Sequence, residues 1–227
     1  MESGKVGAII VAAGQSSRMG GADKIFSELD GRPLLARVID IFQACEAIDE
    51  IVIVLGQENL KRGQMIMENS NWEKVTALCQ GGRRRQDSVK EGLKRLTDCR
   101  WVVIHDGARP LLSPELIERG LVEAQKTGAA IAAVPVKDTI KIAAIDGFVR
   151  DTLQRDTLWA AQTPQVFRFD LISQAHERIT EDVTDDAMML EEMGYKVKLY
   201  MGSYDNIKVT TPGDLALVET ILRKKQG

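Results

Sequence analysis

The 227-residue sequence has few cysteines and no long apolar run. Its three cysteines, Cys45, Cys79 and Cys99, are odd in number and include no Cys-x-x-Cys pair, which argues against a disulfide framework and a zinc site. The longest apolar stretches, 6–13 and 129–136, fall far short of the roughly 20 residues that a membrane helix needs. We therefore expect a cytoplasmic protein with reduced thiols and no membrane span.

A surplus of basic residues is also missing. Lys and Arg total 30 and Asp and Glu total 33, so the net charge is −3. Proteins that bind nucleic acid usually carry a basic surplus, because their affinity comes largely from neutralised phosphates, and we expect no nucleic-acid partner. Small phosphorylated ligands are compatible with this charge, since they need only a local group of cations. Residues 1–5 lead directly into an apolar run, so we also expect no signal or transit peptide.

What the chain does contain is an alternation of short apolar runs and amphipathic helical patterns. Runs that are apolar on both faces, as in a covered parallel sheet, lie at 6–12, 51–55, 101–104 and 129–135. Helical patterns lie at 33–44 and 85–96, and others begin at 114 and 212. This order predicts an α/β fold with a doubly wound, mostly parallel, Rossmann-like sheet. The length fits a single domain over residues 1–227.

Residues 138–158 interrupt the alternation. Here Asp146-Gly147 separates two short strand-like runs, which is a strong hairpin signal. A two-stranded hairpin is marginally stable by itself in water, so we expect this arm to pack on another surface. A second subunit is favoured over the arm's own domain. The segment therefore predicts a protruding β-hairpin arm and a homodimer.

The segments that follow the strands are the places to look for a site, because ligands of open α/β sheets bind beyond the carboxyl ends of the strands. The first strand runs into the Gly- and Ser-rich segment 12–24, which carries Arg18 and Lys24. Its spacing fits neither the P-loop nor the dinucleotide fingerprint. Backbone N–H groups in such a segment can nevertheless approach an anion closely.

Two later segments add carboxylates and a third cation. Asp106 follows the strand at 101–104, and its carboxylate is a hard oxygen donor of the kind that magnesium prefers. His105 beside it is interpreted as structural. Asp205 and Lys208 precede the last helix. Together with Arg18 and Lys24, these residues have the chemistry for displacement at phosphorus, in which cations stabilise spreading negative charge.

A pair of glycines, Gly81-Gly82, precedes the helical pattern at 85–96. Glycine at a helix start allows close approach to a ligand. The arginines at 83–85 are interpreted as a solvated patch, and no contact with a base is assigned to them.

In this order the segments resemble the 2-C-methyl-D-erythritol 4-phosphate cytidylyltransferase family of the non-mevalonate isoprenoid pathway. The resemblance runs from Ile9 to Leu222. Its motifs are Ala-Ala-Gly-x-x-x-Arg-Met at 12–19, Gly-Gly…Asp-Ser-Val at 81–89, His-Asp-x-Ala-Arg-Pro at 105–110, Val-Pro-Val-Lys-Asp-Thr-Ile-Lys at 134–141, Leu-Trp-x-Ala-x-Thr-Pro-Gln at 158–165, Thr-Asp-Asp-Ala at 184–187 and Asp-Asn-Ile-Lys-Val-Thr at 205–210. The first of these alone would fit many nucleotidyltransferases, whereas the combination is specific.

The resemblance implies a transferase reaction in which CTP and 2-C-methyl-D-erythritol 4-phosphate give 4-diphosphocytidyl-2-C-methyl-D-erythritol and pyrophosphate. It also implies Mg²⁺ or another hard divalent cation as cofactor. The acceptor is a phosphate monoester, whose second pKa is about 6. It is largely ionised at neutral pH and needs no general base, so a chain with two histidines can carry out this chemistry.

The resemblance also implies roles for individual residues. The catalytic cations that hold the triphosphate would be Arg18, Lys24 and Lys208. The ligands of Mg²⁺, or contacts of the sugar alcohol, would be Asp106 and Asp205. The cytidine would be held by Ala12, Ala13, Gly14, Gly82 and Ser88. The acceptor would be bound by Arg109, Thr139 and Arg155, of which the last two lie on the arm that crosses to the other subunit in the family.

Other functions are less well supported. A cytidylyltransferase for another polyol phosphate, such as ribitol 5-phosphate, would share the first loop and differ around Thr139 and Arg155. A glycosyltransferase often shows an Asp-x-Asp motif, and no two Asp here are two positions apart. An inactive nucleotide-binding regulator would have lost the cations. Some relatives carry a fused cyclase domain, and we expect that second activity to be absent.

Overall fold

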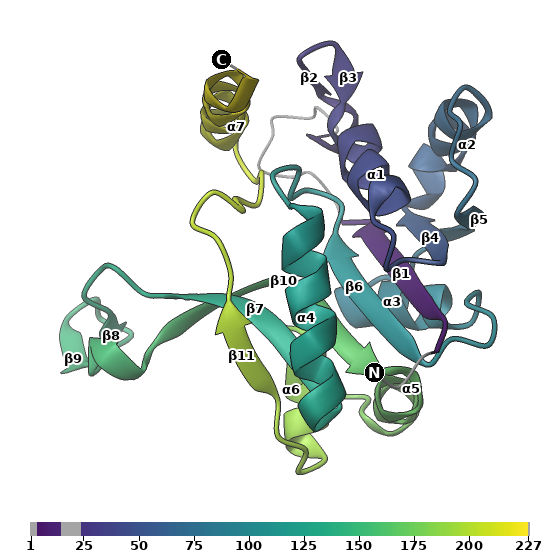
Figure 1. Cartoon of the computed structure of the whole chain (residues 1–227). Coiled ribbons are helices and arrows are strands. Elements are labelled where there is room, and N and C mark those ends of the chain that lie inside the picture. Colours follow the sequence, from purple (N-terminus) through teal and green to yellow (C-terminus); the bar gives the residue numbers. More distant parts are fainter. Residues whose placement is uncertain (1–3, 15–23, 227) are drawn as a thin grey trace.

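A seven-stranded sheet organises the protein (Figure 1), and the computed structural model describes residues 4–14 and 24–226. The strand order is β11-β7-β10-β6-β1-β4-β5. The bounds of these strands are β1 Val6–Ala12, β4 Glu50–Leu55, β5 Val75–Gln80, β6 Trp101–Asp106, β7 Ala129–Pro135, β10 Trp159–Arg168 and β11 Lys198–Met201. Only β10 runs antiparallel to its neighbours β6 and β7. The predicted α/β fold with a mostly parallel sheet is confirmed.

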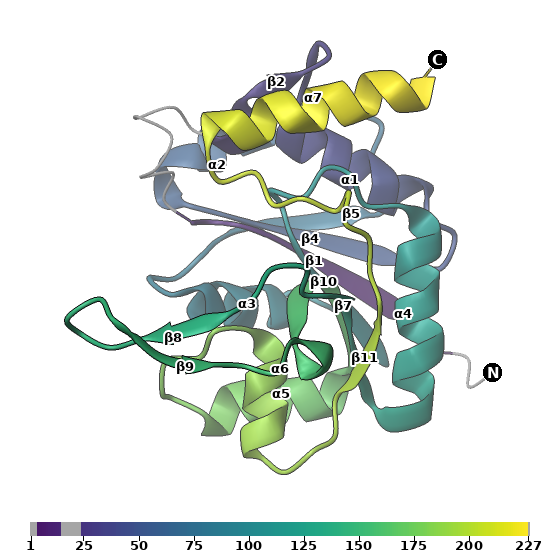
Figure 2. The same cartoon turned by 90° about the vertical axis from the view of Figure 1, so that its left-hand side faces the viewer.

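Helices cover both faces of this sheet because the central strands are apolar on both sides. Along β1, Ala8, Ile10 and Ala12 enter one buried core, while Ile9 enters the other. The first core is closed by α1 Leu34–Ala44, α2 Leu60–Glu68, α4 Pro114–Thr127 and α7 Pro212–Gln226. The second is closed by α3 Arg85–Leu93, α5 Phe169–Arg178 and α6 Asp186–Glu192. Figure 2 shows α1 and α7 on one side of the sheet and α5 and α6 on the other.

Short elements complete the chain, and the helices end close to where the sequence predicts. The short elements are η2 Lys24–Phe26, β2 Glu28–Leu29, β3 Arg32–Pro33, η3 Gln57–Asn59 and η4 Arg155–Thr157. The helix predicted at 85–96 ends at Leu93. Beyond it Leu96 packs against β1, where a Cβ on Gly7 would lie 2.6 Å from a Leu96 methyl. No helix in the described parts of the chain combines the length and apolar character that a bilayer crossing requires.

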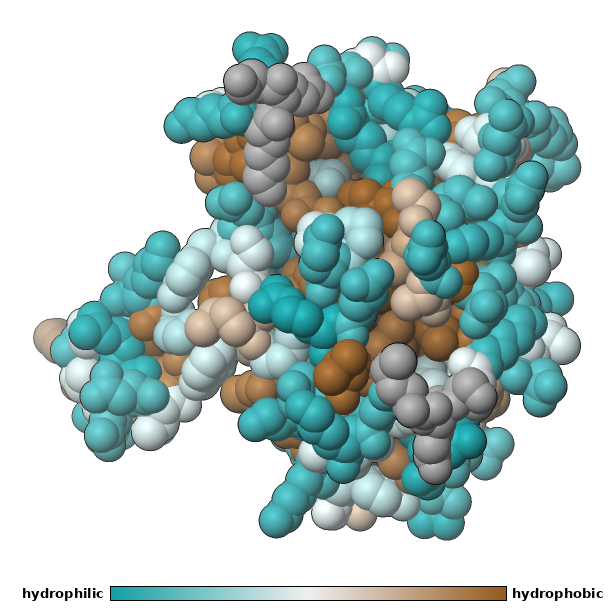
Figure 3. All heavy atoms as spheres, viewed as in Figure 1, coloured by the Kyte–Doolittle hydropathy of each residue, from teal (hydrophilic) through white to brown (hydrophobic). Residues whose placement is uncertain are grey.

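The predicted hairpin is present and stands out from the body. Strands β8 Lys141–Ala143 and β9 Val149–Thr152 pair antiparallel, and Gly147 takes the positive φ of +85° that the turn needs. Ile145, Phe148 and Val149 are exposed apolar residues of this arm. In Figure 3 the arm surface on this side is mainly hydrophilic, with hydrophobic residues among the polar ones.

Candidate active site

A cleft of about 550 Å³ opens at the carboxyl ends of β1, β4, β5 and β6, which is the edge where parallel sheets bind ligands. Its walls include several residues that the sequence assigns to the site: Ala12, Ala13, Gly14, Lys24, Gly82, Ser88, Asp106 and Lys208. Residues from four separate segments of the chain therefore meet at one place. Arg18 lies outside the described residues.

The wall of the cleft that carries Gly82 and Ser88 is formed where α3 begins. Asp87 is the third residue of α3. Its carboxylate accepts from the backbone N–H of Arg84, the residue before the helix, at 3.1 Å and so caps the helix. The Oγ of Ser88 accepts from the N–H of Gly82 at 3.2 Å. A Cβ on Gly81 would lie 2.7 Å from that Oγ, so glycine is needed where the loop approaches the helix. This packing holds Gly82 and Ser88, both predicted to bind cytidine, close together.

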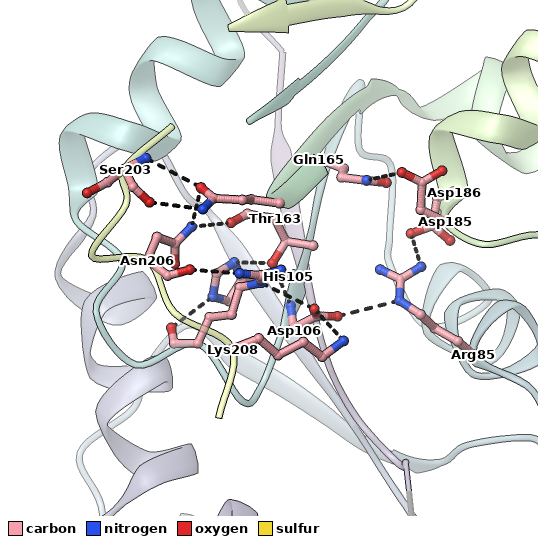
Figure 4. A network of polar contacts seen from close by, with 12 residues as sticks. Arg85, His105, Asp106, Thr163, Gln165, Asp185, Asp186, Ser203, Asn206 and Lys208 are labelled. Carbon is pink, nitrogen blue, oxygen red and sulfur yellow. Dashed lines mark hydrogen bonds and ion pairs between the residues drawn. The ribbon is translucent and has the colours of Figure 1, made fainter. Parts of the chain in front are cut away.

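Asp106 lies at the end of β6 and is surrounded by cations (Figure 4). Its Oδ2 is 2.8 Å from Nζ of Lys208 and 3.4 Å from Nε of Arg109, and its Oδ1 is 3.4 Å from Nε of Arg85. Only 6% of the residue is exposed. One carboxylate thus organises three cations that come from three different segments, and the cluster keeps a net positive charge suited to phosphate groups.

These cations determine the protonation state of Asp106. Burial alone would raise the pKa of its carboxyl, but Arg85, Lys208 and Arg109 together hold that pKa well below its usual range. Asp106 is therefore ionised at neutral pH. An ionised carboxylate can orient ammonium and guanidinium groups or bind a hard cation.

His105, the residue before Asp106, serves the structure rather than proton transfer. It is fully buried, and its Nε2 lies 3.2 Å from the carbonyl oxygen of Arg109 while its Nδ1 lies 3.0 Å from Oγ1 of Thr163. A carbonyl oxygen accepts only, so Nε2 carries the proton and Nδ1 accepts from the hydroxyl. Burial lowers the pKa of His105 to about 4, which keeps the ring neutral at pH 7. These contacts agree with the structural interpretation of His105.

Buried polar contacts with residues near β6 and on β10 hold the loop that carries Lys208 in place. Arg109 donates through Nη1 to the carbonyl of Asn206 at 2.7 Å, and Asn206 donates through Nδ2 to the carbonyl of Thr163 at 2.7 Å. At the other end of the loop, Asp214 accepts from the N–H of Thr210 at 2.9 Å next to the start of α7. The loop position of Lys208 is thereby tied to β6 and β10.

Strand β10 supplies residues that the sequence analysis did not assign to the site. Its pairing with β7 is interrupted between Ala161 and Gln165, and such bulges re-aim side chains near active sites. Inside this break, Thr163 bonds His105 and accepts from the N–H of Asp106 at 3.1 Å. Gln162 donates to the carbonyl of Ser203 at 2.9 Å. Only the family-like motif at 158–165 pointed to this segment.

The arginines at 83–85 differ from the solvated patch that the sequence suggests. Arg84 forms ion pairs with Asp87 at 2.7 Å and Asp182 at 2.9 Å. Arg85 lies between Asp106 and Asp186, at 2.5 Å from the latter. Arg83 is exposed. The interpretation fails for Arg85, because its partners Asp106 and Asp186 come from distant parts of the chain. Arg84 is paired, but 39% of its side chain stays exposed.

The remaining predicted residues do not line the cleft that the described residues form. Thr139, Arg155 and Asp205 are exposed. Arg155 donates through Nη1 to the carbonyl of Lys137 at 2.9 Å, which places it at the root of the arm. Arg109 lies just beneath the cleft and is tied to Asp106 and Asn206.

Comparison with known proteins gives a consistent result. A family model described as 2-C-methyl-D-erythritol 4-phosphate cytidylyltransferase matches residues 6–224. A curated relative of that name from Dehalococcoides mccartyi is 51% identical over 220 residues, which is 97% of each chain. Another from Alkaliphilus oremlandii is 46% identical over 230 residues, covering 98% of this chain and 97% of the relative. The crystal structure of 4-diphosphocytidyl-2C-methyl-D-erythritol synthase from Anaerococcus prevotii superimposes with a TM-score of 0.85 at 33% identity over 96% of each chain.

Proposed function

The chain belongs to the 2-C-methyl-D-erythritol 4-phosphate cytidylyltransferase family, and from this premise we propose that the cleft around Asp106 is its active site. As a member of the family it transfers the cytidylyl group of CTP to 2-C-methyl-D-erythritol 4-phosphate and releases pyrophosphate. The observation that carries the site assignment is the meeting of Lys24, Asp106 and Lys208 at one cleft beside the glycine-rich start of α3.

In the proposed reaction, an oxygen of the acceptor phosphate attacks the α-phosphorus of CTP. A new P–O bond forms as the bond to the leaving pyrophosphate breaks, so negative charge spreads over the oxygens around phosphorus. Arg18, Lys24 and Lys208 stabilise that charge. The cytidine lies against Ala12, Ala13, Gly14, Gly82 and Ser88. No general base is required, because the attacking phosphate is already ionised.

Asp106 has the chemistry to hold the divalent cation. It is an ionised oxygen donor within the cleft, and Mg²⁺ in phosphate sites commonly uses only one or two protein carboxylates besides the substrate. The described residues contain no group of three His, Cys, Asp or Glu side chains arranged for a metal. Three cations already surround Asp106, so the phosphates of CTP would supply the other oxygen ligands of the ion. When bound, Mg²⁺ neutralises charge on the phosphates; the role of Asp205 stays a prediction.

The acceptor side of the site is proposed to be completed by a second copy of the chain. Thr139 and Arg155 belong to the arm and do not line the cleft of their own chain. The exposed Ile145, Phe148 and Val149 give the arm an apolar surface that a partner would cover. We also place the enzyme in the cytoplasm, where the three buried thiols would stay reduced.

Pyrophosphate release tests the function directly. Purified protein is incubated with CTP, Mg²⁺ and either 2-C-methyl-D-erythritol 4-phosphate or ribitol 5-phosphate. Release with the first acceptor alone is expected. Release with ribitol 5-phosphate alone would support the proposed nucleotide site and overturn the assignment of the acceptor. No release with either acceptor would overturn the proposed site chemistry.

A further inference from the structure

Arg85 connects the floor of the cleft to the outer helices. It is the first residue of α3, and its Nε lies 3.4 Å from Oδ1 of Asp106. Its Nη1 lies 2.5 Å from Oδ2 of Asp186, the first residue of α6. Figure 4 shows the guanidinium between the two carboxylates. One side chain therefore bridges an acid inside the cleft and an acid outside it.

Burial of the Asp186 carboxylate costs free energy, because the charge loses its contact with water. The residue is 0% exposed and does not line the cleft. Its Oδ1 has no hydrogen-bond partner among the described residues, and Nε2 of His176 lies 3.7 Å from that oxygen. Arg85 is thus its main partner. A buried carboxylate is tolerated when a cation satisfies it, so Asp186 and Arg85 constrain one another.

The effect on Arg85 is to fix the direction of its guanidinium. Arg85 itself lines the cleft, and the contact of its Nη1 with Asp186 holds the guanidinium so that Nε faces Asp106. A planar guanidinium can contact two carboxylates with two different nitrogens, whereas an ammonium is a point charge on a flexible stem. Lysine at this position would keep the charge and lose the bridge.

Asp106 is shared in turn with Lys208, which contacts its other oxygen at 2.8 Å. A rotation of the Asp106 carboxylate would therefore move Lys208. The predicted cytidine contacts, such as Gly82 and Ser88, do not depend on that rotation, because they bond each other. A disturbance at Arg85 should thus reach the reacting groups more than nucleotide binding.

We propose that Arg85 is a positioning residue that orients Asp106, and that the buried Asp186 holds Arg85 in that role. The inference rests on the proposed function of the cleft. It assigns Arg85 no contact with substrate and gives the acidic motif at 184–187 a function at a distance from the chemistry.

The test compares Arg85→Lys, Asp186→Asn and the double variant with wild type. For each single variant, kcat should fall by about tenfold or more while KM for CTP stays within about threefold, because positioning and not binding is lost. The double variant should be no slower than the slower single one, because both changes break the same bridge. Arg32→Lys is the matched control, since it alters a two-nitrogen ion pair with Asp40 away from the cleft, and it should leave kcat unchanged.

Each other outcome overturns the proposal. A large rise in KM for CTP at unchanged kcat would mean that Arg85 binds the triphosphate itself. Wild-type kcat in Asp186→Asn would mean that Asp186 does not hold Arg85. The unfolded fraction of each variant is measured by circular dichroism. If the loss of activity only matches that fraction, the ion pair between Arg85 and Asp186 is purely structural.

A crystal structure of Asp186→Asn gives a readout that needs no activity. The contact between Arg85 and Asp106 should be lost or redirected in it. If the contact persists unchanged, the proposal fails even though the enzyme is active. If wild type is inactive with both acceptors, the proposed function fails, and this structure still decides whether Asp186 orients Arg85.

Discussion

The hydroxyl of Thr163 donates to Nδ1 of His105 at 3.0 Å, although 58 positions separate the two residues. The same oxygen accepts the backbone N–H of Asp106 at 3.1 Å. Strand β10 is thereby joined to the carboxyl end of β6 at the point where β6 delivers its carboxylate to the cleft. Because every one of these groups is buried, the network defines both the tautomer of His105 and the backbone position of Asp106.

Removing that hydroxyl should destabilise the protein. Thr163→Val keeps the volume but leaves Nδ1 of His105 and the N–H of Asp106 without their partner, and we expect a loss of about 1–3 kcal/mol in the free energy of unfolding. Thr163→Ser, which retains the hydroxyl, should lose clearly less. Urea unfolding of the two variants beside wild type measures this. Equal stabilities for Val and Ser at this position would contradict the network.

The buried ring of His105 should make stability depend on pH. Burial lowers its pKa to about 4 in the folded state, against about 6.5 in an unfolded chain. Between these values the unfolded chain binds more protons, so stability falls as pH falls from about 6.5 to 4, by about 3 kcal/mol in total. Above pH 6.5 the ring contributes no pH dependence.

Unfolding measured at several pH values in His105→Gln isolates that contribution. The glutamine amide can still donate toward the carbonyl of Arg109 but does not titrate. The slope between pH 6.5 and 4 should therefore be shallower than in wild type. Parallel curves for the two proteins would show that His105 does not titrate as its burial requires.

Lys208 should be needed for turnover and not for folding. Its Nζ contacts Asp106 at 2.8 Å, yet 40% of its side chain is exposed, so Lys208→Ala removes charge at the cleft without opening the core. We expect kcat/KM to fall by about 10²–10³-fold, as for loss of one transition-state contact, with little change in Tm. Lys126→Ala, which breaks a surface pair with Glu123 on α4, is the matched control. Activity of Lys208→Ala close to that of the control would remove Lys208 from the proposed catalytic group.

If the arm completes the site of a second subunit, mixing two variants that are inactive alone should restore activity in mixed dimers. Arg18→Ala alters the cation loop and Arg155→Ala alters the arm, so a mixed dimer contains one site with neither change. Mixing should return about a quarter of wild-type activity per site if exchange is random and each intact site works independently. Exchange is verified with differently tagged chains. Demonstrated exchange without recovery would mean that each site is built from one chain.

Several parts of the architecture could be predicted from local pattern. The apolar runs at 6–12 and 129–135 coincide with β1 and β7, because a strand covered on both faces must be apolar throughout. Asp146-Gly147 marks a turn because glycine adopts the positive φ found there. The positions of Asp106, Lys24 and Lys208, near strand ends or before the last helix, predict that they share one site edge, and all three line the cleft.

Other features have no local signature. The antiparallel strand β10 enters between β6 and β7, and its sequence carries no mark of which neighbours it will have. The pattern at 83–85 indicates an exposed basic patch, because the Asp186 carboxylate that pairs with Arg85 lies 101 positions away in the sequence. Whether such charges are solvated or paired depends on how α3 and α6 pack, since ion pairing acts over only a few ångströms.

Local sequence pattern was therefore enough to predict the class of fold, the edge of the sheet where the cleft opens and several of the residues that line it, because these follow from short-range periodicity and from the geometry of parallel strands. Tertiary structure alone decided that Asp106 is shared by three cations, that His105 is a neutral buried strut, and that Asp186 reaches the site through Arg85. Those outcomes depend on the approach of segments distant in the chain and on the loss of water around them, and neither is encoded in any single stretch of residues.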